Sequence, residues 1–137
     1  MIPLRILLVE DALPALQDLR QVLEETGEFE ISCATSSPAG MLGLARTRPD
    51  LLVLNPYAGR GSIEAWRRAV GRYRQHHPLG LLALAHRIPP RDQDSLQEMA
   101  DLGIFSPGVE ARRIQAILEE WADSERLLAG AAPETSR

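Results

Sequence analysis

Short apolar runs alternate along this chain with longer segments in which apolar residues recur every three or four positions. The short runs predict strands, and three of them are continuous rather than alternating, as in strands buried on both faces. The longer segments predict helices with one apolar face. Glycine and proline fall at the ends of these segments, where both residues act as stop signals. The expected strands are residues 4–10, 29–34, 51–55, 81–85 and 103–105.

Each predicted helix carries a stripe of apolar residues that should pack against a sheet. Five strand–helix units in succession favour right-handed crossovers, a parallel sheet and helices on both of its faces. We therefore expect an α/β fold, a flavodoxin-like three-layer sandwich whose five parallel strands lie in the order 2-1-3-4-5. The stripe residues are Leu16, Leu19 and Leu23; Met41, Leu44 and Ala45; Ile63, Trp66, Val70 and Tyr73; Leu96, Met99 and Ala100; and Ile114, Ile117, Leu118 and Trp121.

The length of 137 residues suits one domain with its own hydrophobic core. Residues 1–123 contain the five strand–helix units, and we expect them to form that domain. Residues 124–137 exceed what the sheet needs. We expect residues 125–128 to lengthen the last helix, and the chain from Gly130 onward to form a frayed tail or linker.

The composition argues against several classes of protein. No apolar run is long enough to cross a membrane, and the first residues lack the pattern of a signal peptide. Cys33 is the only cysteine, so no internal disulfide can form, which suits a reducing cytoplasm. Because Cys33 lies in a predicted strand, we expect a buried thiol. The chain is thus expected to be cytoplasmic and to have no membrane contact.

Positive charge is concentrated in one segment. Residues 56–91 hold seven arginines and one acid, Glu64, so this segment carries +6 and the remainder −10 of the net −4. A solvated helix face with Glu64 and Arg68 paired is the simplest interpretation, a docking surface for an acidic protein comes next, and nucleic acid is the weakest. His76 and His77 end the third helix and are expected at the surface. The candidate interaction surface comprises Arg60, Arg67, Arg68, Arg72, Arg74 and Arg87.

Two of the predicted strands end in polar residues of different kinds. The first runs into Glu10 and Asp11, whereas the third runs into Asn55, which Pro56 follows. If these strands are neighbours in a parallel sheet, their polar ends meet in the crevice where α/β sheets usually bind ligands. Carboxylates can bind a cation and accept a phosphoryl group, but an amide is a poor ligand and a poorer nucleophile.

Over roughly residues 4–122 the chain resembles the receiver domain of bacterial response regulators. The resemblance is carried by RILLVED at residues 5–11, RPDLLVL at 48–54, and Ala100-Asp101 ahead of Ser106-Pro107. In that family an acidic pair binds Mg²⁺, and an aspartate ending the third strand accepts phosphate from a histidine kinase. A hydroxyl residue ending the fourth strand and a lysine before a proline contact the phosphoryl group. An aromatic residue in the fifth strand reorients on activation.

Position by position, the resemblance retains only the acidic pair, as Glu10 and Asp11. Pro107 matches the family's proline, whose preceding peptide bond is cis. The other positions are altered, and we expect them to be inactive. Asn55 stands at the phosphate-accepting position, Ala85 at the hydroxyl position, Gly103 at the aromatic position and Ser106 at the lysine position.

Neighbouring residues do not restore this site. Glu64 is the only acid between Asp50 and Asp92, and the chain contains no lysine. The neutral amide of Asn55 should not accept phosphate, because an acyl phosphate needs an anionic oxygen nucleophile. Pro56 closes the usual route of deamidation, since its nitrogen carries no hydrogen. With only two carboxylates left, we expect Mg²⁺ to bind weakly or not at all, and we expect no other cofactor.

Two interpretations of the acidic pair, Glu10 and Asp11, remain open. Arg60 or Arg87 could neutralise the pair through a bidentate contact, or the two acids are solvated or cap the following helix. No glycine-rich phosphate loop, nucleophile elbow or cysteine–histidine pair is present, so no enzymatic activity is expected.

Taken together, these features predict a pseudo-receiver: a signalling domain of the two-component or phosphorelay type that binds another protein without being phosphorylated. The candidate surfaces are the fourth helix, fifth strand and fifth helix, and the basic third helix. The expected partner is another signalling protein, with a homodimer as the alternative. A second hypothesis keeps phosphorylation at an unusual residue such as Asp11. A third, nucleic-acid binding, predicts affinity that falls steeply with salt.

Overall fold

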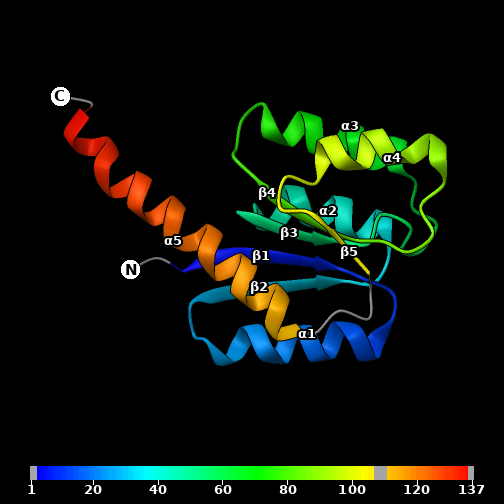
Figure 1. The fold of residues 1–137 in the computed structure, drawn as a ribbon, viewed down its shortest axis with the longest axis horizontal. Helices are drawn as coiled ribbons and strands as arrows, with labels where there is room; N and C mark the ends of the chain where they lie inside the picture. Colours follow the sequence, from blue (N-terminus) through cyan, green and yellow to red (C-terminus); the bar gives the residue numbers. More distant parts are fainter. Residues whose placement is uncertain (1–2, 107–110, 136–137) are drawn as a thin grey trace.

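The computed structural model describes residues 3–106 and 111–135, with side chains up to residue 128. Five parallel strands form one sheet in the order β2-β1-β3-β4-β5. Helices lie on both faces of this sheet (Figure 1). The flavodoxin-like α/β fold and the strand order predicted from the sequence are thereby confirmed. The strands are β1 (Leu4–Val9), β2 (Phe29–Ala34), β3 (Leu51–Leu54), β4 (Gly80–Leu84) and β5 (Ile104–Phe105).

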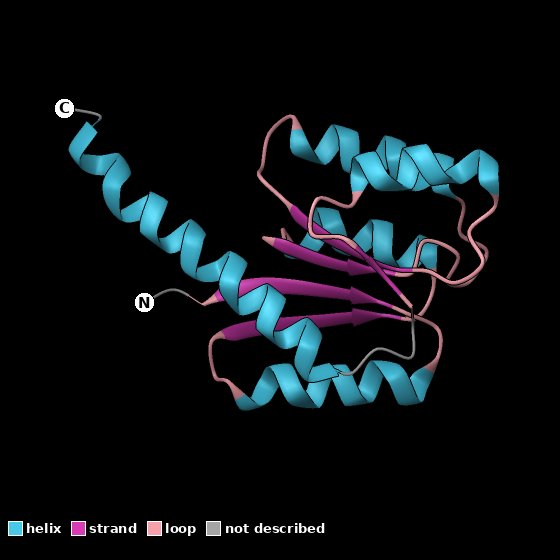
Figure 2. Cartoon of the chain, in the orientation of Figure 1, coloured by secondary structure: helices cyan, strands magenta, loops and turns pink. Residues whose placement is uncertain are grey.

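The helices divide into two layers. Two of them pack on one face of the sheet and three on the other, which gives the three-layer sandwich seen in Figure 2. The first layer contains α1 (Leu13–Glu25) and α5 (Ala111–Thr135), and the second contains α2 (Ser37–Thr47), α3 (Ile63–Arg74) and α4 (Pro90–Met99).

The sheet separates two hydrophobic cores. Successive side chains of a strand point to opposite faces, and in β1 this sends Leu7 and Val9 toward α2, α3 and α4. Ile6 and Leu8 point the other way, toward α1 and α5. All four are at most 1% exposed. A continuous apolar run was therefore the right signal for a strand covered on both faces.

The pairing of β1 with β3 places the polar strand ends side by side. Val9 lies opposite Leu54 in the register. The next residue of β3, Asn55, donates its backbone N–H to the carbonyl of Val9 at 2.8 Å. Glu10 follows Val9 and donates its own N–H to the carbonyl of Ala34 in β2 at 3.1 Å. Glu10 and Asn55 are thus neighbours at the carboxyl edge of the sheet.

Two features differ from expectation. Cys33 is exposed, so the expectation of a buried thiol is wrong. The reason lies in the tertiary structure, because β2 pairs only with β1 and forms an edge of the sheet.

Helix α5 runs unbroken to Thr135, past Gly130, where a frayed tail was expected. Its later turns are rich in alanine, the best helix former. No helix among residues 3–106 and 111–135 is long and apolar enough to span a membrane.

Trp66 is the largest side chain of the core between the sheet and α2, α3 and α4. It is 0% exposed, and its indole Nε1 donates to Ser37 Oγ at 2.9 Å. The Ser37 hydroxyl in turn donates to the carbonyl of Ala58 at 2.7 Å. The ring also faces Gly40, where an added Cβ would come within 2.9 Å of it. Trp66 therefore links α3 to the first turn of α2, and Ser37 links that turn to the loop that precedes α3.

We predict that Trp66→Ala lowers the free energy of unfolding by about 3–5 kcal/mol, because it removes a buried indole and leaves a cavity. Urea denaturation followed by circular dichroism measures this change. Leu42→Ala is the control, since Leu42 is 48% exposed, and it should change stability by less than ~0.5 kcal/mol. Equal losses for the two variants would contradict the packing described here.

Candidate functional site

The site at the carboxyl edge of the sheet is organised by one hydrogen bond. Asn55 Nδ2 donates to Glu10 Oε2 at 2.7 Å. Glu10 is only 3% exposed, whereas Asp11 beside it is exposed. The sequence-predicted acidic pair is therefore split into a buried acid that contacts Asn55 and a surface acid that does not.

The orientation of the Asn55 amide follows from its second contact. The backbone N–H of Tyr57 donates to Asn55 Oδ1 at 3.0 Å. A backbone N–H can only donate, so the oxygen of the amide must face Tyr57. The NH₂ group is then left to face the Glu10 carboxylate. The loop after β3 thus presents a donor, not an acceptor, to the buried acid.

The buried carboxylate of Glu10 accepts hydrogen bonds from two groups of the protein. The same Oε2 that takes the Asn55 amide also accepts the backbone N–H of Asp11 at 2.9 Å. Charge-assisted hydrogen bonds of this kind offset the cost of removing a carboxylate from water. An aspartate in place of Asn55 would be acceptor-only when ionised and would set two negative charges against each other.

Asp11 contacts the loop between β3 and α3. Its Oδ2 accepts the backbone N–H of Gly59 at 3.2 Å. Gly59 has φ +44°, and an added Cβ would lie 2.5 Å from the Cβ of Ser36. Only glycine fits this close approach. Gly59 therefore lets the loop fold back over the acidic pair.

Of the two sequence-based interpretations of the acidic pair, the arginine contact is not seen among the described residues, and solvation holds for Asp11 alone, since Asp11 is exposed and Glu10 is buried. Arg60 and Arg87 are exposed, and no ion pair recorded for the described part of the chain joins them to Glu10 or Asp11. The residue before α1 is Ala12, which supplies no side-chain cap. Sequence reasoning missed the true contact because it treated Asn55 only as a lost nucleophile and not as a hydrogen-bond donor.

Tyr57 extends the network to α4. Its hydroxyl donates to Asp92 Oδ2 at 2.8 Å, and Asp92 lies in the first turn of α4. Burial, followed by this hydrogen bond, raises the pKa of Tyr57 to about 12. Hydrogen bonds therefore run from Glu10 through Asn55 and Tyr57 to Asp92. Neither Tyr57 nor Asp92 had been singled out from the sequence, since a tyrosine and a helix-start aspartate carry no signal of their own.

The other positions that correspond to the receiver site offer few chemical groups. Ala85 is buried, at 6% exposure, and presents only a methyl group. Gly103 has φ +108°, and an added Cβ would lie 3.1 Å from the Phe105 ring, so a larger residue would be strained there. Ser106 is exposed. Pro107, with the isomer of the bond before it, lies outside the described residues.

The candidate arginine surface is divided among different roles. Glu64 binds Arg67 at 2.9 Å and Arg68 at 3.2 Å, which confirms the expected Glu64–Arg68 pair. Arg74 is bound to Asp101 at 3.0 Å and also donates to the carbonyl of Leu79. Arg60, Arg72 and Arg87 are exposed and form no recorded ion pair within the described chain.

Metal ligands are sparse in the described residues. They contain no group of three or more histidine, cysteine, aspartate or glutamate side chains placed to hold a metal ion. At the acidic pair, the Asn55 nitrogen points at the Glu10 oxygen that a cation would need. A bound Mg²⁺ would have to displace this amide and recruit a harder ligand.

We predict that neither tyrosine ionises near pH 10, the usual value for a phenol. Burial, followed by the nearby charge of Asp50, raises the pKa of Tyr73 to about 12. The pKa of Tyr57 is also raised to about 12. These pKa values are higher in the folded chain, so their contribution to stability is present below about pH 10. It is lost as the pH rises toward 12. Phenolate absorbance in a pH titration tests this, with Tyr57→Phe isolating Tyr73. Ionisation of either tyrosine near pH 10, while circular dichroism shows that the chain is still folded, would contradict this prediction.

We predict that Asn55→Asp destabilises the fold at pH 7 by about 1–3 kcal/mol, because it removes a donor to a buried carboxylate and adds a like charge. The loss should shrink as the pH falls, since a proton on one carboxyl ends the repulsion and restores a donor. Added Mg²⁺ should raise the melting temperature of this variant and leave that of the wild type unchanged. Asn55→Ala, which adds no charge, is the control and should show no response to Mg²⁺. A wild type stabilised by Mg²⁺ as strongly as the variant would contradict the arrangement.

Comparison with known proteins gives similarity at the level of structure. No family model matches the sequence, and no curated protein matches it. The signal receiver domain of a LuxO-type repressor from Vibrio parahaemolyticus superposes with a TM-score of 0.75 at 17% identity, covering 93% of this chain and 98% of the other. A CheY-like receiver domain from Methanospirillum hungatei JF-1 gives 0.76 at 16%, covering 91% and 98%. A response regulator from Desulfuromonas acetoxidans gives 0.70 at 21%, covering 88% and 97%. The fold of this chain is that of the receiver domains of response regulators.

Proposed function

We propose that this protein is a pseudo-receiver, a signalling domain that binds another signalling protein without being phosphorylated and catalyses no reaction. One observation carries the proposal: the side chain at the phosphate-accepting position, Asn55, is an amide that donates to buried Glu10 at 2.7 Å. The fold shared with receiver domains supports a role in two-component or phosphorelay signalling. We place that role in the cytoplasm, in keeping with the single cysteine of the chain.

The amide of Asn55 disfavours both phosphorylation and cation binding at this site. It offers no anionic oxygen to attack phosphorus. It also supplies, through its NH₂ group, a hydrogen-bond donor at the Glu10 oxygen that would otherwise be open to a cation. We therefore infer that the site binds Mg²⁺ weakly or not at all and needs no cofactor. The buried methyl of Ala85 and the glycine at position 103 support the proposed loss of phosphorylation, since neither offers a side chain that could contact a phosphoryl group or reorient on activation.

Phosphorylation at Asp11 is the less favoured alternative. Its carboxylate is exposed and anionic, which would suit a nucleophile. One of its oxygens, however, accepts the Gly59 N–H, and the positions that would help to hold a phosphoryl group are Ala85 and Ser106. No specific contact of the described residues favours this alternative.

If the site at Asn55 accepts no phosphate, the protein must act through its surface. Leu127 and Leu128 are exposed on the later turns of α5. The C-terminal part of this helix extends beyond the sheet (Figure 1). These features keep a homodimer as the alternative to a different partner. Nucleic acid is disfavoured, since two of the candidate arginines are bound to Glu64 and Arg74 to Asp101.

We predict that incubation with acetyl phosphate and Mg²⁺ leaves the intact mass of this protein unchanged. A receiver domain that retains its aspartate, treated alongside, is the positive control. Asp11→Asn separates the alternative, because a phosphoryl-sized, hydroxylamine-labile mass gain that this variant abolishes would establish Asp11 as the acceptor and overturn the proposal. Any protein that co-purifies with the chain should do so equally with and without the phosphodonor.

A further inference from the structure

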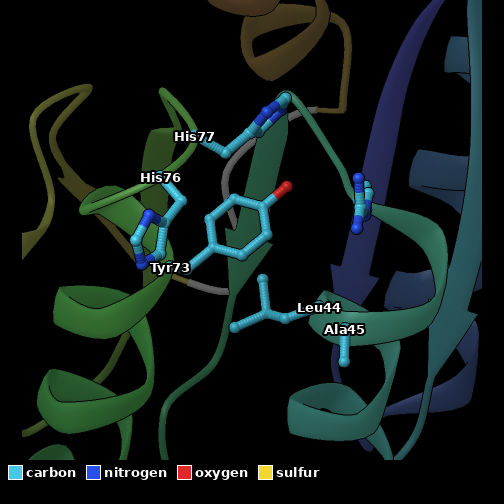
Figure 3. Close-up of a pocket in the computed structure, with 6 residues that line it drawn as sticks. Leu44, Ala45, Tyr73, His76 and His77 are labelled. Atoms are coloured by element: carbon cyan, nitrogen blue, oxygen red, sulfur yellow. The ribbon is translucent and has the colours of Figure 1, made fainter.

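A groove lies between α2 and α3, on the face of the sheet opposite α1 and α5. It consists of two hollows, of about 340 Å³ and about 320 Å³. Both are lined by Leu44, Ala45 and Tyr73, so the hollows form one continuous trough. Figure 3 shows Leu44 and Ala45 on α2 facing Tyr73, with His76 and His77 beyond it at the end of α3.

The α2 wall of the groove is unusually apolar for a surface helix. It carries no charged residue before Arg46. Ala45, which lines the groove, is exposed, and Met41 is only partly buried. Leu42, on α2 but outside the lining, is 48% exposed. A helix at the surface normally turns a polar face to water. The apolar outer side of α2 is therefore a surface suited to being covered.

Among the described residues, two arginines and no carboxylate line the groove, although Asp50 lies 3.3 Å from His77, one of the lining residues. Arg48 lines one hollow and Arg72 the other. Both are exposed, and no carboxylate lines either hollow. Within the described chain no recorded ion pair engages either arginine, in contrast to Arg67 and Arg68 on the same helix, which bind Glu64. Two cationic groups are thus free to meet anions beside an apolar floor.

The α3 wall of the groove is held in place by its own contacts. The Tyr73 hydroxyl donates to the carbonyl of Pro49 at 2.6 Å. The Tyr73 ring meets His77 edge-on with 5.2 Å between ring centroids, and His77 Nε2 lies 3.3 Å from Asp50 Oδ1. A preformed wall lowers the entropy cost of binding.

The groove lies away from the acidic pair. Helix α2 begins at Ser37, which is bound to the loop after β3 at the carboxyl edge of the sheet. It ends at Thr47, just before β3 begins at the opposite edge. The groove occupies the later turns, from Met41 to Arg48. Its occupation would therefore require no change at Asn55.

We propose that this groove binds a short amphipathic helix from an acidic partner protein, with apolar side chains in the trough and carboxylates on Arg48 and Arg72. The proposal rests on the protein-binding function proposed above and names its surface and partner chemistry. From Met41 to Arg48 the groove spans about 10 Å of helix rise, which suits two turns of a bound helix. Anchors spaced four and seven residues apart would then lie along the trough.

A synthetic probe tests the proposal directly. The probe is a fluorescein-labelled peptide with leucine at helical spacing on one face and glutamate elsewhere; its counterpart has lysine for every glutamate. Measured by fluorescence anisotropy with the full chain, the acidic peptide should bind at least roughly tenfold more tightly than the basic one, and less tightly as salt rises. Amide NMR shifts should appear along α2 and α3 and not at Glu10 or Asn55.

Matched variants locate the binding site. Ala45→Glu places a carboxylate in the trough and Arg72→Glu reverses a rim charge, so each should weaken acidic-peptide binding by roughly tenfold or more. Ala39→Glu on α2 and Arg68→Glu on α3 make the same changes outside the groove and should stay within about twofold. All four positions are exposed, and circular dichroism verifies folding.

Three outcomes would overturn the proposal. They are no binding of the acidic peptide, equal binding of the two peptides, and equal effects of the groove and control variants. Binding of anilinonaphthalene sulfonate in the groove without binding of the peptide would assign the groove to small amphipathic anions instead. None of these outcomes changes the mass after phosphodonor treatment, so failure of the groove and failure of the pseudo-receiver proposal are distinguishable.

Discussion

The hydrogen bond from the Asn55 amide to the Glu10 carboxylate determines the state of the whole site. Glu10 is 3% exposed, and a buried carboxylate needs donors or a cation. Asn55 supplies the donor at 2.7 Å. Through its other end Asn55 binds the backbone of Tyr57, whose hydroxyl reaches Asp92 on α4. The Asn55 side chain thereby joins the ends of β1 and β3 to a helix on the surface.

This bond depends on the register of the sheet and on the packing beneath it. Pairing of β1 with β3 sets Asn55 beside Glu10. Trp66 and Ser37 then hold the loop that leads away from Asn55 against α2. The same face of the molecule carries the groove between α2 and α3, so core packing supports both the site at Asn55 and the proposed docking surface.

Much of the fold could be read from the chain, because β1, β3 and β4 are continuous apolar runs and the helices between them have apolar stripes. Trp66, Leu118 and the other central stripe residues are buried as their spacing indicated. The exposure of Cys33 was not predicted, because its apolar neighbours suggested burial. The predicted strand order already placed β2 at an edge of the sheet, but strand order alone does not show which side chains of an edge strand the helices leave uncovered. The extent of α5 was also underestimated, because glycine and proline near its end suggested a stop.

By itself, the sequence determined the order of elements, the identity of the residues at the strand ends and the absence of lysine, since composition and periodicity are local properties. The tertiary structure alone decided that Glu10 is buried while Asp11 is exposed and that the NH₂ of Asn55 faces the acid. It also decided that, among the described residues, no acid pairs with Arg72 while Arg67 and Arg68 bind Glu64. These outcomes depend on which groups meet across the sheet or across a helix surface, and the distances between such groups are set by packing and not by position along the chain.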